Sequence, residues 1–131
     1  MTVIGVGIDL VDVERFRVSL QRTPSMIDRM FTEGERAYAL SASDPTERFA
    51  VRFAAKEAVM KAMGVGLGAF GFHDVEVLRD ESGRPDLGVY GSALALAGER
   101  RIGAWQISLT HTATSAGAFV VASASTVGVD R

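Results

Sequence analysis

Near the start of the chain, two patterns of hydrophobic residues predict two different elements of secondary structure. Residues 2–10 form an apolar, β-branched run, which is typical of a buried strand and places Asp9 at its carboxyl end. Residues 13–22 carry apolar side chains at helical spacing among charged ones, so they predict an amphipathic helix. Asp12 stands directly before that helix, where an acid acts as an N-cap.

Two further helices begin at sequence signals for helix N-termini. Residues 32–35, Thr-Glu-Gly-Glu, have the spacing of a capping box and predict a short helix that runs towards Leu40. Residues 44–47, Asp-Pro-Thr-Glu, repeat the signal with an acid at the cap and proline at the first helical position. A long helix without internal glycine or proline follows, and we expect it to end at Gly64.

The second half of the chain predicts mainly strands. They are a hairpin of residues 73–79 and 87–90, an alanine- and leucine-rich helix at 91–101, and strands at 105–110 and 118–122. This order favours an α+β fold with a largely antiparallel sheet, packed with one long central helix and shorter helices. We expect a single domain over residues 1–125 and a frayed tail over residues 126–131.

Composition narrows the class of protein. The 131 residues suit one domain, and 47% hydrophobic with 23% charged residues excludes a mainly disordered chain. A net charge of −2 argues against a general nucleic-acid binder, and the absence of cysteine excludes disulfides and thiol chemistry. No apolar run is long enough to span a membrane, so we expect a cytoplasmic protein without a membrane partner.

Two acids are candidates for binding a metal ion. Asp9 ends a strand, and Glu57 lies among apolar neighbours on the long helix, where a carboxylate must be paired, protonated or bound to a cation. A purely structural alternative is a surface ion pair between Glu57 and Lys61, with Asp9 capping a turn. If the acids do bind a metal, two carboxylates without cysteine suit Mg²⁺.

Basic residues gather on the same helix. Arg48, Arg52 and Lys56 follow one another four residues apart, so they form either a solvated face or a phosphate-binding stripe. Only two of the 14 basic residues are lysines, Lys56 and Lys61, which points to a place where a compact ammonium is needed.

A glycine-rich loop and two histidines are the remaining candidates for ligand binding. Residues 66–71 match the pattern G-x-G-x-x-G, but this loop leaves a helix and enters a strand, so it does not indicate dinucleotide binding. The loop is either a simple connector or a site of close backbone approach to a ligand. His73 is expected to be structural or exposed, whereas His111, beside a polar loop, is equally compatible with ligand binding.

Several segments together carry a family pattern over nearly the whole chain. They are Gly7-Ile8-Asp9-Leu10-Val11, Phe31-Thr32-x-x-Glu35, Arg52-Phe53-Ala54-Ala55-Lys56-Glu57-Ala58-x-x-Lys61-Ala62, Gly64-x-Gly66, Asp74-Val75-Glu76-Val77, Gly83-x-Pro85 and Ser108-Leu109-Thr110-His111-Thr112. In this combination and order the sequence resembles the holo-[acyl-carrier-protein] synthases, the small bacterial class of 4′-phosphopantetheinyl transferases.

The resemblance implies an activity and roles for the acids. Such an enzyme transfers the phosphopantetheine arm of coenzyme A to a serine hydroxyl of an apo acyl carrier protein, in support of fatty acid biosynthesis, and releases adenosine 3′,5′-bisphosphate. Asp9 and Glu57 would hold Mg²⁺ against the diphosphate, and Lys61 would stabilise the leaving phosphate. The general base would be Glu57 or a water held by the metal.

The resemblance also implies binding surfaces and an assembly. Coenzyme A would contact Arg48, Arg52, Lys56, Lys61, Gly64, Gly66, Pro85, Thr110 and His111. Arg48 would be the nearest substitute for the basic residues that many family members carry ahead of the long helix, near the 3′-phosphate. The acidic carrier protein would dock on Arg15, Arg22 and Arg29. The family forms homotrimers with active sites between subunits.

Two other functions compete with this interpretation. A Mg²⁺-dependent phosphohydrolase could use Asp9 and Glu57 with water as the nucleophile, and it would need no carrier protein. A non-catalytic binding module would use Glu57 and Lys61 only as a structural pair, and Glu57→Gln would then leave ligand binding intact.

Overall fold

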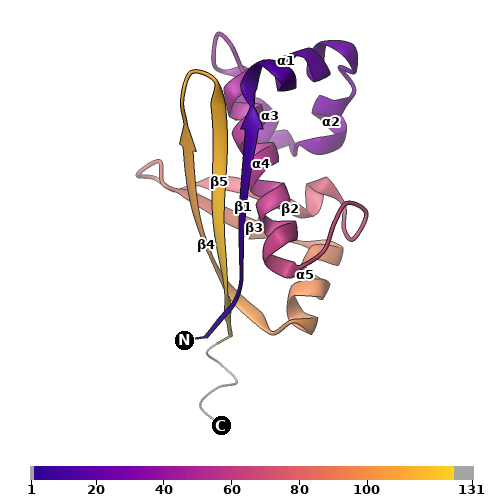
Figure 1. Cartoon of the computed structure of the whole chain (residues 1–131), viewed down its shortest axis with the longest axis vertical. Coiled ribbons are helices and arrows are strands. Elements are labelled where there is room, and N and C mark those ends of the chain that lie inside the picture. The colour runs from indigo at the N-terminus through magenta and orange to yellow at the C-terminus, as the bar shows by residue number, and fades with distance from the viewer. Residues whose placement is uncertain (1, 126–131) are drawn as a thin grey trace.

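The computed structural model describes residues 2–125, and the expected frayed tail, residues 126–131, lies outside them. Eleven elements follow one another, with the shortest a 3₁₀ turn (Figure 1). They are β1 (Val3–Asp12), α1 (Val13–Arg22), α2 (Met26–Met30), α3 (Glu33–Leu40), α4 (Thr46–Met63), η1 (Phe72–Asp74), β2 (Val75–Arg79), β3 (Pro85–Val89), α5 (Gly91–Glu99), β4 (Ile102–His111) and β5 (Ser115–Ala124).

The predicted N-caps of α1 and α3 and the predicted end of α4 are confirmed, whereas α4 begins at Thr46, one residue later than predicted, with Pro45 as its N-cap. The Asp12 side chain accepts from the backbone N–H of Arg15 at 2.9 Å, and Thr32 and Glu35 form a complete capping box. Helix α4 ends at Gly64, whose φ of 71° is the left-handed conformation that glycine adopts most readily. Sequence patterning missed α2 and the turn η1, because both are too short to show a period.

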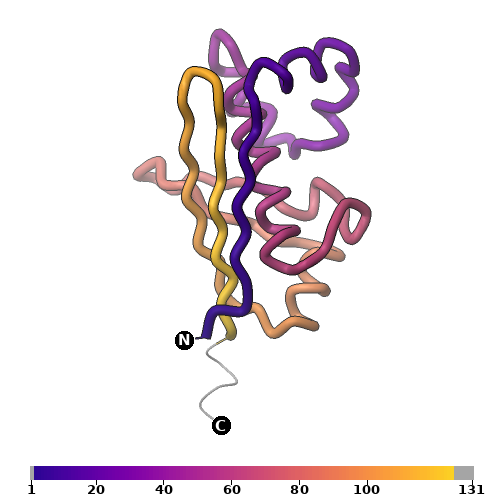
Figure 2. Tube along the Cα trace, viewed as in Figure 1, coloured from indigo at the N-terminus to yellow at the C-terminus, as the bar shows by residue number. Residues whose placement is uncertain are grey.

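The strands form two antiparallel sheets rather than one. The larger sheet has the order β1-β5-β4, so the last strand of the chain lies between the first strand and β4. This places β1 and β5 side by side along their whole length (Figure 2). The smaller sheet is the hairpin of β2 and β3 that the sequence predicts.

Helix α4 covers one face of the larger sheet, and small residues allow a close fit. Alanines on α4 pack against the alanine- and valine-rich inner face of β5, where Val120 is fully buried. On β1 the inward positions are Gly5 and Gly7, and a Cβ at Gly7 would collide with the carbonyl oxygen of Ala58. Backbone therefore packs directly against backbone between β1 and α4.

The expectation that the first strand is buried is wrong, because six of the ten residues of β1 are exposed and only Gly7 is buried. Because the glycines of β1 face the helix, its large apolar side chains point to the other side of the sheet, where no element of residues 2–125 covers them. The exposed residues of this open apolar face are Ile4, Val6, Ile8 and Leu10 on β1 and Phe119 on β5. Among the described helices, none is long and apolar enough to cross a membrane.

Candidate active site

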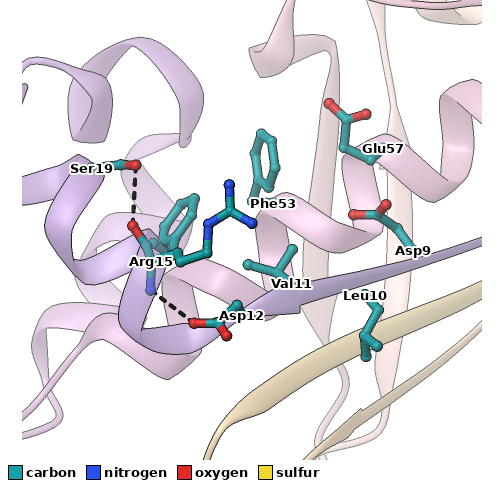
Figure 3. A pocket seen from close by; sticks show the side chains of 9 residues that line it. Asp9, Leu10, Val11, Asp12, Arg15, Ser19, Phe53 and Glu57 are labelled. Atoms are coloured by element: carbon teal, nitrogen blue, oxygen red, sulfur yellow. Dashed lines mark hydrogen bonds between the residues drawn. The ribbon is translucent and has the colours of Figure 1, made fainter.

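The close packing of β1 on α4 brings Asp9 and Glu57 to the same pocket. This carboxylate pocket has a volume of about 350 Å³ and is also lined by Arg15, Phe53 and neighbouring residues of β1 and α1. Figure 3 shows the two carboxylates together on one side, with Arg15 and Phe53 beside them. The two acids that the sequence singles out therefore line one pocket.

Lys61 lies at the same place because it follows Glu57 by one helical turn. Its Nζ lies 3.2 Å from Oδ1 of Asp9 and donates a hydrogen bond to the carbonyl oxygen of Ile8 at 3.0 Å. The structural alternative of a Glu57–Lys61 ion pair is not observed, since Lys61 pairs with Asp9 instead. Lys61 remains exposed, so its ammonium can also reach a ligand in solution.

The surroundings of Glu57 favour its protonated form. Burial raises the pKa of the Glu57 carboxyl, the negative charge of Asp9 raises it further, and the positive charge of Lys61 opposes both effects. A carboxyl whose pKa is raised in a pocket is a candidate proton acceptor or metal ligand.

The donor set suits a hard divalent cation that also binds substrate. Mg²⁺ is commonly coordinated by one or two protein carboxylates, while waters and phosphate oxygens supply the remaining ligands. Residues 2–125 contain no cluster of three or more acidic, histidine or cysteine side chains that could hold a metal by themselves. Asp9 and Glu57 thus fit a substrate-assisted Mg²⁺ site and not a closed structural one.

A second pocket lies at the other edge of the sheet. It too has a volume of about 350 Å³, and it brings together candidates from α4, the β2–β3 hairpin and β4, namely Arg48, Arg52, Pro85 and His111. We call it the arginine pocket. His111 lies at the end of β4, with Nδ1 3.4 Å from Oε1 of Glu47.

Arg52 is the clearest sign that the arginine pocket receives a ligand. Only 4% of Arg52 is exposed, and its Nε is a buried donor without a hydrogen-bond partner in the described part of the chain. Its Nη1 donates to the carbonyl oxygen of Arg48 at 3.3 Å. A buried unpaired donor costs free energy, which an anion bound in the pocket would recover. The prediction of a solvated basic face is therefore wrong at Arg52.

Lys56, the third member of the basic stripe, does not reach either pocket. Its side chain is fully buried, and its Nζ lies 2.9 Å from Oε1 of the equally buried Glu35. The same ammonium donates to the carbonyl oxygens of Phe72 and Val75. Lys56 thus joins α4 to the hairpin and has no exposed surface for coenzyme A, so the expected contact is replaced by a buttressing role.

The remaining candidates are spread over the surface. Gly64, Gly66 and Thr110 are exposed and line neither of the two pockets. The docking candidates Arg15 and Arg22 are exposed on α1, and Arg29 is exposed on α2. Arg15 and Arg22 share a surface hollow that adjoins the carboxylate pocket. His73 is exposed, as expected, with Nε2 2.7 Å from the carbonyl oxygen of Asp28.

Sequence reasoning missed two residues of the arginine pocket, Tyr38 and Arg79. Tyr38 lies on α3 and Arg79 ends β2, so only the packing of these two elements brings them together. No motif or spacing that we used connects positions so far apart.

Comparison with known proteins now defines the class. Residues 5–122 match the family model described as the 4′-phosphopantetheinyl transferase superfamily. The chain therefore belongs to this superfamily, and its relatives narrow the group further.

The relatives are holo-[acyl-carrier-protein] synthases, and the chain is a member of that group of enzymes. It is 48% identical over 120 residues to the one from Salinispora arenicola, covering 92% of this chain and 98% of that protein. It is 46% identical over 122 residues to the one from Streptomyces avermitilis, covering 93% and 98%. The crystal structure of the Bacillus anthracis synthase in complex with CoA (3′,5′-ADP) is similar at a TM-score of 0.80 and 33% identity, with 95% of this chain and 100% of that chain covered.

Proposed function

We propose that this protein transfers 4′-phosphopantetheine from coenzyme A to a serine hydroxyl of an apo acyl carrier protein in a Mg²⁺-dependent reaction. The observation that carries the proposal is that Asp9 and Glu57 line one pocket and Lys61 pairs with Asp9, in a chain of this family. The second product is adenosine 3′,5′-bisphosphate. We place the reaction in fatty acid biosynthesis in the cytoplasm.

The carboxylate pocket is the proposed place of the chemistry. Mg²⁺ held by Asp9 and Glu57 would neutralise negative charge on the diphosphate of coenzyme A. The serine oxygen forms a bond to the phosphorus that carries pantetheine, and the bond to the bridging diphosphate oxygen breaks. Glu57, with its raised pKa, accepts the serine proton in this proposal, and the Lys61 ammonium stabilises the charge that develops on the leaving phosphate.

The arginine pocket is the proposed place of the nucleotide. The support is the buried, unpaired Nε of Arg52 and the adjacent cation Arg48, which together favour a phosphate group. Pro85 and His111 line the same pocket and would contact the rest of the nucleotide. The loop with Gly64 and Gly66 would follow the pantetheine arm, and Thr110 would contribute a hydroxyl next to His111.

The geometry of the two pockets supports a homotrimer with shared active sites. Strand β5 lies between β1 and β4 (Figure 1). One pocket has lining residues on β1 and the other on β4, so the two pockets lie towards opposite edges of one sheet. One coenzyme A would occupy both if the carboxylate pocket of one subunit faced the arginine pocket of the next. The open apolar face supplies a surface that such an assembly would bury.

Arg15, Arg22 and Arg29 are the proposed docking residues for the acidic carrier. Their exposure, and the position of Arg15 at the carboxylate pocket, support a carrier that approaches over α1 and α2. Exposed charges of this kind act mainly on the rate and orientation of encounter.

Intact-mass spectrometry of an apo acyl carrier protein tests the proposal. After incubation with this protein, coenzyme A and Mg²⁺, we expect a mass gain equal to one phosphopantetheine, located on serine and lost with EDTA. Glu57→Gln should abolish the gain while the protein remains folded. Hydrolysis of coenzyme A without a carrier would indicate the phosphohydrolase, and unchanged transfer by Glu57→Gln would contradict the assigned roles.

A further inference from the structure

The arginine pocket contains an arrangement that the proposed function does not require. Three guanidinium groups surround the ring of Tyr38, with the Cζ atoms of Arg48, Arg79 and Arg52 at 4.1, 4.4 and 4.5 Å from the ring centroid. These residues come from three elements, since Tyr38 lies on α3, Arg79 ends β2, and the other two lie one turn apart on α4.

This cluster holds positive charge that the protein does not neutralise locally. Within residues 2–125, none of the three arginines has a carboxylate within ion-pair distance. Burial lowers the pKa of the Arg52 guanidinium, and the charges of Arg79 and Arg48 lower it further against the opposing effect of Glu35. The three cations therefore repel one another, and something must hold them together.

Tyr38 provides the contacts that hold them. Its ring attracts each guanidinium, and its backbone carbonyl accepts a hydrogen bond from Nη1 of Arg48 at 2.8 Å. Nη1 of Arg48 also donates to Oγ of Ser41 at 3.0 Å, so Arg48 is tied to the end of α3 by two bonds. Nε of Arg52 is buried and has no hydrogen-bond partner within residues 2–125.

We propose that Tyr38 is a positioning residue that preassembles Arg48, Arg52 and Arg79 into a site for a phosphate monoester. The inference rests on the proposed function and goes beyond it. It adds a third arginine, Arg79, and a positioning residue, Tyr38, that touches no reacting atom. A dianionic monoester is the group that three converging guanidiniums match in charge and in hydrogen-bond geometry. Holding the arginines in place before binding lowers the cost of ordering them.

Nucleotide binding without a carrier protein tests this inference directly. Titration calorimetry would compare coenzyme A, which carries a phosphate monoester, with dephospho-coenzyme A, which lacks it. Tyr38→Leu should weaken binding of coenzyme A about tenfold and leave binding of dephospho-coenzyme A unchanged, whereas Tyr38→Phe keeps the ring and should stay within about twofold of wild type. Tyr38 is only half-buried, so all three proteins should fold.

Arg79→Ala supplies a second and independent variant. Arg79 is exposed, and its guanidinium contacts the ring of Tyr38 from outside α4. We expect the same selective loss as in Tyr38→Leu. Arg84→Ala is the matched control, because Arg84 is an exposed arginine of the same hairpin that lies outside the arginine pocket.

Kinetics separate positioning from a general structural effect. With coenzyme A, Tyr38→Leu should raise KM and leave kcat unchanged, and with dephospho-coenzyme A it should change neither. Any of three results would overturn the inference. Tyr38→Leu could weaken the binding of both nucleotides equally, it could lose no more affinity than Tyr38→Phe, or it could bind as tightly as wild type. Selective nucleotide binding in a protein that transfers nothing would support the inference and refute the proposed function.

Discussion

The Lys61 ammonium lies 3.2 Å from the carboxylate of Asp9, although 52 residues separate them along the chain. The contact exists because α4 lies directly on the glycines of β1. Asp9 is only 17% exposed in its side chain, whereas that of Lys61 is 54% exposed. The pair is therefore asymmetric, with a fixed acid and a cation that can turn towards a phosphate.

Lys61→Ala should depress the chemical step more than the affinity for coenzyme A. If the ammonium stabilises the leaving phosphate, its loss lowers kcat on the order of 10²-fold, as for other groups that act on developing charge. Steady-state transfer kinetics check this, with Lys61→Arg as the control that keeps the charge. A rise in KM at constant kcat would place Lys61 in binding alone.

The raised pKa of Glu57 predicts a shifted pH profile. A carboxylate that accepts a proton works only when ionised, so kcat/KM should be low at acid pH and rise as the pH passes the raised pKa of Glu57. The midpoint should therefore lie above about 4.3, the ordinary value for glutamate. Lys61→Arg serves as the control, because it keeps the Glu57 carboxyl and the neighbouring positive charge, so its midpoint should stay the same. A wild-type rate that is constant across this range would argue against Glu57 as the base.

Gly7→Ala should destabilise the fold, because the new Cβ would collide with the backbone of α4 at Ala58. Overpacking of this kind costs about 2 kcal/mol, and the collision with backbone leaves little room for relaxation. Chemical denaturation measures the change. Gly98→Ala is the control, since its Cβ would meet no atom within 4 Å and alanine favours the helix α5. Equal stability of Gly7→Ala and wild type would show that β1 can move away from α4.

Sequence reasoning succeeded where the signal is local. A capping box predicted the start of α3 and a glycine predicted the end of α4, because these contacts lie within four residues of each other. Asp9 and Glu57 were paired through chemistry and family resemblance, and the packing of β1 on α4 supports that pairing.

Sequence reasoning failed where tertiary packing determines the environment of a side chain. Helical spacing placed Arg48, Arg52 and Lys56 on one stripe, but α4 is covered on several sides, so a shared stripe does not mean a shared environment. The inward face of β1 carries glycine, which reverses the usual rule that the larger apolar side chains point inward. The meeting of Tyr38 with Arg79 depends on how α3 packs against β2, and no local pattern records it.

Lys56→Met should destabilise the protein by about 3 kcal/mol, because it leaves the buried carboxylate of Glu35 without its cation. Glu35 also accepts hydrogen bonds from the backbone of Thr32 and Val77, so it cannot move out to solvent easily. Denaturation of the single variant and of Lys56→Met with Glu35→Gln checks this. The double variant should regain part of the loss, since no charge remains buried. A loss that is larger in the double variant would contradict the argument.

The open apolar face of the sheet makes the proposed trimer testable. Val6 is 55% exposed, belongs to the apolar residues of β1 that form this face, and lines neither pocket. A glutamate there would be buried without a partner in any assembly that covers the face, which costs far more than the same charge in water.

Val6→Glu should therefore convert the assembly to monomers and abolish transfer, because each active site would lose the half that another subunit contributes. Light scattering after size-exclusion chromatography gives the mass, and circular dichroism shows whether the fold is retained. Leu94→Glu is the matched control, since Leu94 is 57% exposed on α5, outside the sheet face, and should leave mass and activity unchanged. A wild-type monomer, or an active Val6→Glu monomer, would show that one chain contains a complete site.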